Sequence, residues 1–136
     1  MKSSIISTLV MLVLLTGSNA LAQSQSEWVE RFNSYQQEYR GLFEKCMPSR
    51  KSVRMFVDMA NCIWRKEQVL LKRYDLEHIL YDVSYNRYSQ MFNMGKTAAA
   101  ELDSGGWEYF SEASVNLEAD VEELQIELMK SFLRKQ

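Results

Sequence analysis

The stretch CMPSRKSVRMFVDMANC, residues 46–62, contains both cysteines of the chain and its only proline. A zinc site usually needs four ligands, and His78 is the only histidine. A redox-active pair would normally have two residues between its cysteines, whereas fifteen lie between these two. We therefore predict a structural disulfide between Cys46 and Cys62, which fastens the end of one helix to the body of the next as an antiparallel hairpin.

The beginning of the chain has the features of a cleaved secretory signal peptide. Lys2 precedes an uncharged apolar run over residues 5–17, and the small-x-small sequence at 20–22 is a cleavage pattern. The alternative, an uncleaved membrane anchor, needs about 20 apolar residues, and this run is shorter. We predict cleavage after Ala22, a mature chain over residues 23–136 without a transmembrane span, and a periplasmic or secreted location, where disulfides form.

Helix is the only regular structure that the pattern of residues 23–136 favours. Glycine and proline are scarce, no alternating strand pattern is present, and apolar residues recur at steps of three and four. The length allows one hydrophobic core. The predicted fold is a single all-α domain, a small antiparallel bundle of three to four helices.

The first two helices are expected on either side of Pro48. The first begins after Ser26 as N-cap and ends at Met47. Its expected buried residues are Trp28, Phe32, Tyr35, Tyr39, Leu42 and Cys46. The second begins near Ser49 or Ser52, and its expected buried residues are Val53, Phe56, Val57, Ala60, Ile63, Trp64 and Leu71.

The third helix is predicted to begin after Asp75 as N-cap, although no glycine or proline prevents the second helix from continuing into it. Its aliphatic side comprises Leu76, Ile79, Leu80, Val83, Met91 and Met94. Arg87 falls within this side, where a buried charge would need a partner. A glycine turn at 105–106 precedes the fourth helix, whose expected buried residues are Phe110, Ala113, Leu117, Val121, Leu124, Leu128 and Phe132.

A second stripe on the third helix is aromatic and consists of Tyr81, Tyr85, Tyr88 and Phe92. It could be core, packed under the first helix near Tyr35 and Tyr39, because a domain of this size needs most of its large apolar groups inside. It could instead be a contact surface, because aromatic residues are enriched at protein interfaces. These four residues are the candidate interface.

Charge is unevenly distributed along a chain whose net charge is −2. Residues 49–74 are mainly basic and residues 103–136 mainly acidic. One interpretation places the second and fourth helices side by side in the bundle. The other makes the basic helix a patch for an anionic envelope surface such as lipid head groups. The small net charge gives no indication of nucleic-acid binding.

Signatures of catalysis and cofactor binding are missing from the sequence. It contains no nucleophile elbow, zinc-protease motif, phosphate-binding loop or dinucleotide fingerprint, and we expect no enzyme and no cofactor. Thioethers suit Cu(I), so the pairs Met55 and Met59 on one helix and Met91 and Met94 on another form a candidate metal site. Helical methionines are also ordinary core residues.

The functional hypothesis that follows is a non-catalytic periplasmic protein that binds another envelope protein or a second copy of itself. An inhibitor or immunity-type role toward a toxin or envelope hydrolase is one form of it. Two alternatives remain open: Cu(I) binding by the methionines, and binding to an anionic envelope surface through the basic helix.

Overall fold

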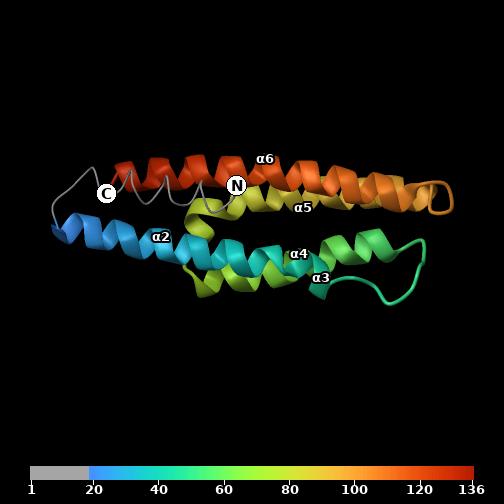
Figure 1. Ribbon diagram of the computed structural model, residues 1–136, viewed down its shortest axis with the longest axis horizontal. Coiled ribbons are helices and arrows are strands. Elements are labelled where there is room, and N and C mark those ends of the chain that lie inside the picture. The colour runs from blue at the N-terminus through green and yellow to red at the C-terminus, as the bar shows by residue number, and fades with distance from the viewer. Residues whose placement is uncertain (1–18) are drawn as a thin grey trace.

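The computed structural model describes residues 19–136 of the chain, with side chains from Ser24 onward (Figure 1). The apolar run of the predicted signal peptide lies outside these residues. The expected cleavage position after Ala22 falls in the first helix that the structure describes. Signal-peptide cleavage remains a prediction.

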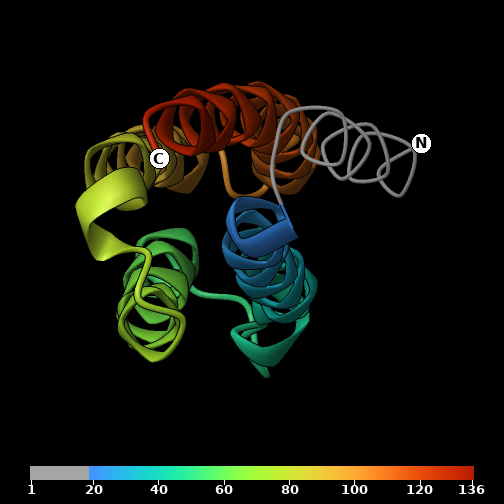
Figure 2. The same ribbon diagram turned by 90° about the vertical axis from the view of Figure 1, so that its left-hand side faces the viewer.

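The described part of the chain folds into α-helices without a strand. These helices are α2 (Asn19–Arg40), α3 (Leu42–Lys45), α4 (Met55–Arg73), α5 (Glu77–Ala100) and α6 (Gly106–Arg134). The four long helices run alternately up and down in two layers, α2 with α4 and α5 with α6 (Figures 1 and 2). The predicted all-α antiparallel bundle is confirmed.

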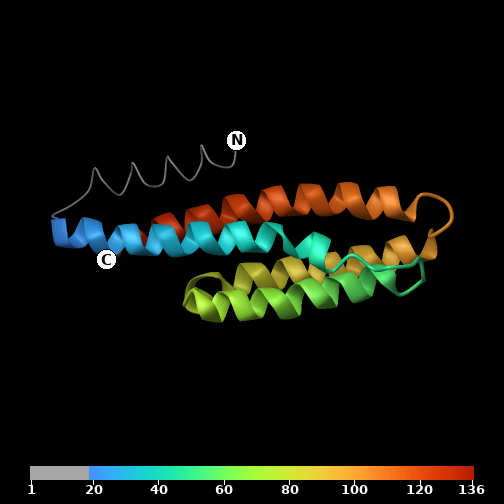
Figure 3. The same cartoon turned by 60° about the horizontal axis from the view of Figure 1, so that its bottom comes forward.

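Backbone packing is close between α4 and α5 and between α5 and α6, whereas α2 and α6 do not pack closely. The ends of α2 and α6 nevertheless meet, because Gln25 Nε2 donates a hydrogen bond to the Leu133 carbonyl at 3.0 Å (Figure 3). The Trp28 and Phe132 ring centroids lie 4.8 Å apart at the same end. The helices α4 and α6 lie diagonally across the bundle (Figure 2) and touch through the rings of Phe56, Trp107 and Phe110, but they do not pack side by side along their length, so the side-by-side interpretation of their charges is wrong.

The predicted disulfide is present. It joins Cys46, at the end of α3, to Cys62, two turns into α4, with a Cα–Cα distance of 5.8 Å. This distance is typical of disulfides. The intervening segment turns back after Pro48, so that α4 runs antiparallel to α2 (Figure 3).

The break between α4 and α5 falls where it was expected, but the role predicted for Asp75 is wrong. Asp75 has φ 55° and its side chain caps no helix. The Leu76 N–H donates to the Leu71 carbonyl and the Asp75 N–H to the Lys72 carbonyl, which is the Schellman pattern that ends a helix. Aspartate is one of the few residues that tolerate this left-handed backbone. Leu76 follows it and is fully buried.

Other expected boundaries and faces also differ from the structure. The first helix begins at Asn19, includes Ser26 and ends at Arg40 and not at Met47, because a break at Gly41 sets off the short α3. Helix α4 begins at Met55, which leaves Val53 63% exposed. On α6 the residues Leu124 and Leu128 are exposed, contrary to prediction. The buried face of α6 is rotated to include Ser114, Gln125, Ile126, Met129 and Leu133. Periodicity located the helix correctly but misplaced its face, because polar residues are buried on it.

The core is continuous between the layers. Its largest fully buried apolar and aromatic side chains are Tyr35, Phe32, Phe56, Phe110, Met59, Leu71, Leu76, Leu80, Met91 and Met129. Gly95 lets α5 approach α4 closely, since an added Cβ would lie 3.1 Å from the backbone at Phe56. In residues 19–136 no helix has the length and apolar character that a membrane span would require.

Gly106 is required at the turn between α5 and α6, and we expect Gly106→Ala to lower the free energy of unfolding by about 1–3 kcal/mol. The added Cβ would lie 2.3 Å from the Ala98 carbonyl oxygen and 2.7 Å from that of Glu101, so the backbone must shift. Gly41→Ala is the matched control, because the nearest atom there lies at an ordinary 3.5 Å. Urea unfolding of both variants measures the difference; equal stability would contradict this account of the turn.

Candidate functional site

Five aromatic side chains form a continuous surface row across α4 and α5, which we call the aromatic ladder. Its members are Trp64, Tyr81, Tyr85, Tyr88 and Phe92. The Trp64 ring centroid lies 5.7 Å from those of Tyr81 and Tyr85 and 5.4 Å from that of Tyr88. Such separations are typical of favourable aromatic pairs. The four residues of the candidate interface therefore lie together, with Trp64 as a fifth member.

Exposure divides the ladder. Tyr81 is 41% exposed and Tyr85 46%, whereas Tyr88 and Phe92 are half-buried against the core. The interpretation of the whole stripe as core is wrong for Tyr81 and Tyr85. Trp64, expected on the buried face of its helix, is also half-buried. The stripe packs beside α4 and not under α2, because Trp64 projects toward α5 at this level.

Cationic residues accompany the ladder. Exposed Arg65 follows Trp64 in sequence, and Lys96 Nζ lies 5.4 Å from the centroid of the Phe92 ring. The Tyr88 hydroxyl donates a hydrogen bond to Asn61 Oδ1 at 2.6 Å, which fixes the ring between the two helices. The surface therefore combines aromatic area, tyrosine hydroxyls and positive charge.

The four candidate copper ligands lie mainly in the hydrophobic core. Met55, Met59 and Met91 are buried, and Met94 is half-buried against them. Packing alone accounts for these positions, since methionine fills irregular core space. In residues 19–136 no group of three or more His, Cys, Asp or Glu side chains is arranged to hold a metal ion.

A buried ion pair between α5 and α4 occupies the centre of the bundle. Arg87 is 3% exposed and Glu67 1% exposed, and their side chains form a salt bridge. The hydroxyl of buried Tyr35, from α2, donates a hydrogen bond to the same Glu67 carboxylate and accepts one from Arg87 at 3.2 Å. Gln125 Nε2, from α6, donates to the Tyr35 hydroxyl at 3.1 Å. All four long helices thus contribute to one network.

The guanidinium of Arg87 also reaches the side of α6 that faces α2. Arg87 Nη1 lies 2.7 Å from Glu118 Oε1, and Arg87 Cζ lies 3.8 Å from the centroid of the Tyr39 ring. The Tyr39 hydroxyl donates to the other oxygen of Glu118. Nearer the surface, Arg40 pairs with Glu122 at 3.0 Å. These two pairs, together with the Gln125–Tyr35 hydrogen bond, bridge α2 and α6 in the middle of the bundle.

Burial determines the protonation of this network. It raises the pKa of the Tyr35 and Tyr39 phenols well above the ordinary value, so both remain hydrogen-bond donors. Burial also raises the pKa of Glu118, against the opposing effect of Arg87. For Arg87 burial alone would lower the pKa, but Tyr39, Glu67 and Glu118 together raise it. The arginine is therefore permanently charged.

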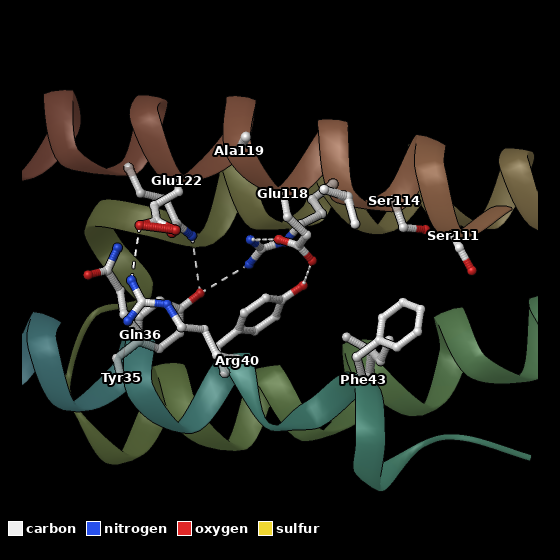
Figure 4. A pocket seen from close by; sticks show the side chains of 14 residues that line it. Tyr35, Gln36, Arg40, Phe43, Ser111, Ser114, Glu118, Ala119 and Glu122 are labelled. Atoms are coloured by element: carbon white, nitrogen blue, oxygen red, sulfur yellow. Dashed lines mark hydrogen bonds and ion pairs between the residues drawn. The ribbon is translucent and has the colours of Figure 1, made fainter. Parts of the chain in front are cut away.

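A cavity of about 370 Å³ lies between α2 and α6 beside this network. Figure 4 shows Gln36, Arg40 and Phe43 on one side of it and Ser111, Ser114, Glu118 and Glu122 on α6 on the other. Its floor includes Ile63 and Arg87 from the other two helices. The volume is within the range of small-molecule sites in proteins.

Periodicity had indicated that Arg87 needs a buried partner, and the structure supplies Glu67 and Glu118. Periodicity alone did not identify Glu67, in a strongly basic helix, as that partner. The cavity and its polar lining residues were likewise not anticipated. A single acidic residue at a core position of a basic amphipathic helix was the one signal that could have pointed to the pair.

Fold and site together define an antiparallel four-helix bundle with one disulfide, a central arginine–carboxylate network and an exposed aromatic ladder. Comparison of the chain with protein-family models, with characterised proteins and with solved structures finds no match.

Proposed function

We infer that this is a non-catalytic binding protein that recognises another envelope protein through the aromatic ladder. The observation that supports this most directly is the exposure of Tyr81 and Tyr85, stacked with their ring centroids 6.1 Å apart. Tyrosine and tryptophan provide large contact area at small entropic cost, and they dominate binding hot spots. A surface role in an inhibitor or immunity-type protein is consistent with such a site.

The absence of catalysis in this proposal is supported by how the titratable groups are arranged. Glu67, Arg87 and Glu118 are bound to one another and to the two tyrosines, so their charges serve mutual pairing. His78, the one imidazole, is exposed and contacts the Trp28 and Phe132 rings.

Charge complementarity identifies the chemistry of the partner. Lys96 lies over the Phe92 ring, and exposed Arg65 follows Trp64 on α4, so we expect the matching surface to carry carboxylates around a small apolar area. A second copy fits less well. A two-fold contact would bring the same cations of both copies together, and a head-to-tail contact with the acidic α6 of another copy would propagate into fibres unless it closed. The proposed partner is therefore a different, acidic protein.

We expect Tyr85→Ala to weaken binding of that partner at least tenfold while lowering the free energy of unfolding by about 1 kcal/mol or less. The ring is 46% exposed, so its loss leaves no large cavity. Tyr109→Ala is the matched control, because Tyr109 is 40% exposed on α6, outside the ladder. A photo-crosslinking amino acid placed at position 85 in the native cells should capture one partner, identified by mass spectrometry, for the affinity measurement.

Specificity of the capture decides the interpretation. The proposal is supported if an acidic partner is captured at position 85 and not at position 109. Its capture should also be lost in the variant that combines Arg65→Glu with Lys96→Glu. A crosslinked dimer of the chain itself would contradict the proposal. Equal affinity of the purified protein and of its Arg65→Glu variant for the partner would also contradict it. So would saturable, Tyr85-dependent binding of the protein to phosphatidylglycerol vesicles when no protein is captured at position 85.

A further inference from the structure

The outer side of α4 carries a line of positive charge that takes no part in the central network. Arg54, Arg65 and Lys72 are exposed and follow one another at steps of eleven and seven residues, which places them on one line along a helix. At 1.5 Å per residue this line is about 27 Å long. Exposed Arg50 and Lys51 add two cations in the segment that leads into α4. We call these five residues the basic stripe.

Carboxylates of the protein neutralise little of the basic stripe. Arg54 pairs with exposed Asp58, at 3.6 Å, and within residues 19–136 the other four cations form no salt bridge. An exposed pair of this kind is weak and easily exchanged for another partner. Five cations and one carboxylate leave a net charge of +4 along this surface. That charge is available to a partner outside the chain.

Much of the negative charge of the chain lies diagonally across the bundle, on α6 (Figure 2). The outer sides of two diagonal helices are separated by about two helix diameters, roughly 20 Å. The screening length at physiological ionic strength is about 8 Å. A partner on the outer side of α4 is therefore exposed to the positive stripe, although the net charge of the whole chain is −2. The exposed carboxylates of α6 are Glu108, Glu112, Asp120, Glu123 and Glu127.

Two exposed valines accompany the cations. Val53, which is 63% exposed, precedes Arg54, and Val69, which is 55% exposed, lies one helical turn from both Arg65 and Lys72. Cations interspersed with exposed apolar side chains along a helix are typical of a surface that rests on a bilayer, where cations contact lipid phosphates and apolar groups enter the head-group region. An extended line of charge also matches a partner that presents many equal anions in one plane.

We propose that the basic stripe docks the protein on the surface of a bilayer rich in anionic phospholipid, with α4 along the membrane plane and α6 on the side away from it. The Cys46–Cys62 disulfide is typical of proteins outside the cytosol, which favours a membrane over a nucleic acid as the anionic partner. The proposal does not depend on the aromatic ladder. Arg65 lies close to both surfaces, and the variants that test the stripe therefore leave it unchanged.

Cosedimentation of the purified, oxidised protein with vesicles tests the proposal. The vesicles contain equal parts of phosphatidylglycerol and phosphatidylcholine, or phosphatidylcholine alone. We expect half-saturation below about 1 mM accessible lipid with the anionic vesicles, because each basic residue near such a surface strengthens binding roughly fivefold. Binding to phosphatidylcholine alone should be at least tenfold weaker. Raising the salt concentration to about 0.5 M should weaken binding to the anionic vesicles at least tenfold, because it screens the exposed charges.

Charge reversals assign the binding to the stripe. Arg50→Glu combined with Lys51→Glu should weaken binding to the anionic vesicles at least tenfold, and so should Arg54→Glu combined with Lys72→Glu. All four side chains are exposed, so both variants should keep the helical circular dichroism of the parent protein. Arg134→Glu combined with Lys135→Glu is the matched control. It changes the net charge equally at the exposed end of α6 and should bind as the parent protein does.

The apolar contribution distinguishes a membrane from a soluble anionic partner. Val53→Ser should weaken vesicle binding about threefold, whereas Val115→Ser, at a position on α6 that is 68% exposed, should leave it unchanged. Tyr85→Ala should also leave it unchanged, which separates this test from that of the ladder. Equal binding to both kinds of vesicle would overturn the proposal. So would full binding by either stripe variant, loss of binding in Tyr85→Ala, or an equal affinity for soluble polyglutamate, which would indicate an acidic protein.

Discussion

Replacing Arg87 with methionine is expected to lower the free energy of unfolding by about 3–5 kcal/mol, the typical effect of removing one partner from a buried ion pair. The substitution keeps the length of the side chain but leaves the carboxylate of Glu67, which is 1% exposed, without its cation. The Tyr35 hydroxyl would remain as a donor to it, which is insufficient to replace a full charge. Urea unfolding followed by circular dichroism measures the loss.

A double substitution separates the loss of the pair from the isolation of the charge. Glu67→Gln combined with Arg87→Met should be more stable than the sum of the two single effects predicts, with a coupling energy of about 1–3 kcal/mol. Arg65→Met is the matched control, an exposed arginine on α4 that should change stability by about 0.5 kcal/mol or less. If Arg87→Met proved as mild as Arg65→Met, the network would not be stabilising the bundle.

Removing the disulfide has the second large effect. Cys46→Ser with Cys62→Ser should lower the free energy of unfolding by about 3 kcal/mol, because the bond closes a loop between residues separated by 16 positions in the unfolded chain. The segment between α3 and α4 has little helix of its own, so the covalent link is the main restraint on this end of the hairpin. The melting temperature should fall by roughly 10 °C.

The redox state provides the control for this prediction. The native protein should show no free thiol with Ellman's reagent in denaturant, and reductant should destabilise it to the level of the double serine variant. Reductant should leave the serine variant unchanged. Two thiols per chain in the protein isolated from its compartment, or equal stability of the reduced and oxidised forms, would contradict the structural role of the bond.

The network and the cavity have a common physical origin. Tyr35, Tyr39, Glu67 and Arg87 fill the middle of the bundle with polar groups, and polar side chains satisfy one another at longer spacing than aliphatic groups. The helices α2 and α6 are therefore joined by hydrogen bonds and ion pairs and not by close packing. A protein with an all-aliphatic centre would close this gap and lose the hollow.

Local features were sufficient to determine the architecture from the sequence. Apolar steps of three and four located the long helices, Pro48 lies in the break before α4 and the 105–106 glycines lie at the start of α6, and two cysteines without a third left one pairing. The break near Asp75 was also predicted, although the residue ends α4 and does not cap α5. Each of these features depends on residues within about one helical turn of each other or on the number of cysteines. The sequence alone is therefore enough to predict them.

Which helices are neighbours was decided only by the tertiary structure. The face that α6 buries, the exposure of Tyr81 and Tyr85, and the diagonal placement of basic α4 and acidic α6 all depend on how the four helices are arranged around the core. The pairing of Arg87 with Glu67 and the cavity beside Gln36 depend on contacts across helices whose relative rotation periodicity does not specify. An amphipathic pattern indicates that one face of a helix is buried, but only tertiary packing determines which helix covers that face. Ion pairs between distant residues can also bury polar groups that the pattern assigns to the solvent-exposed face.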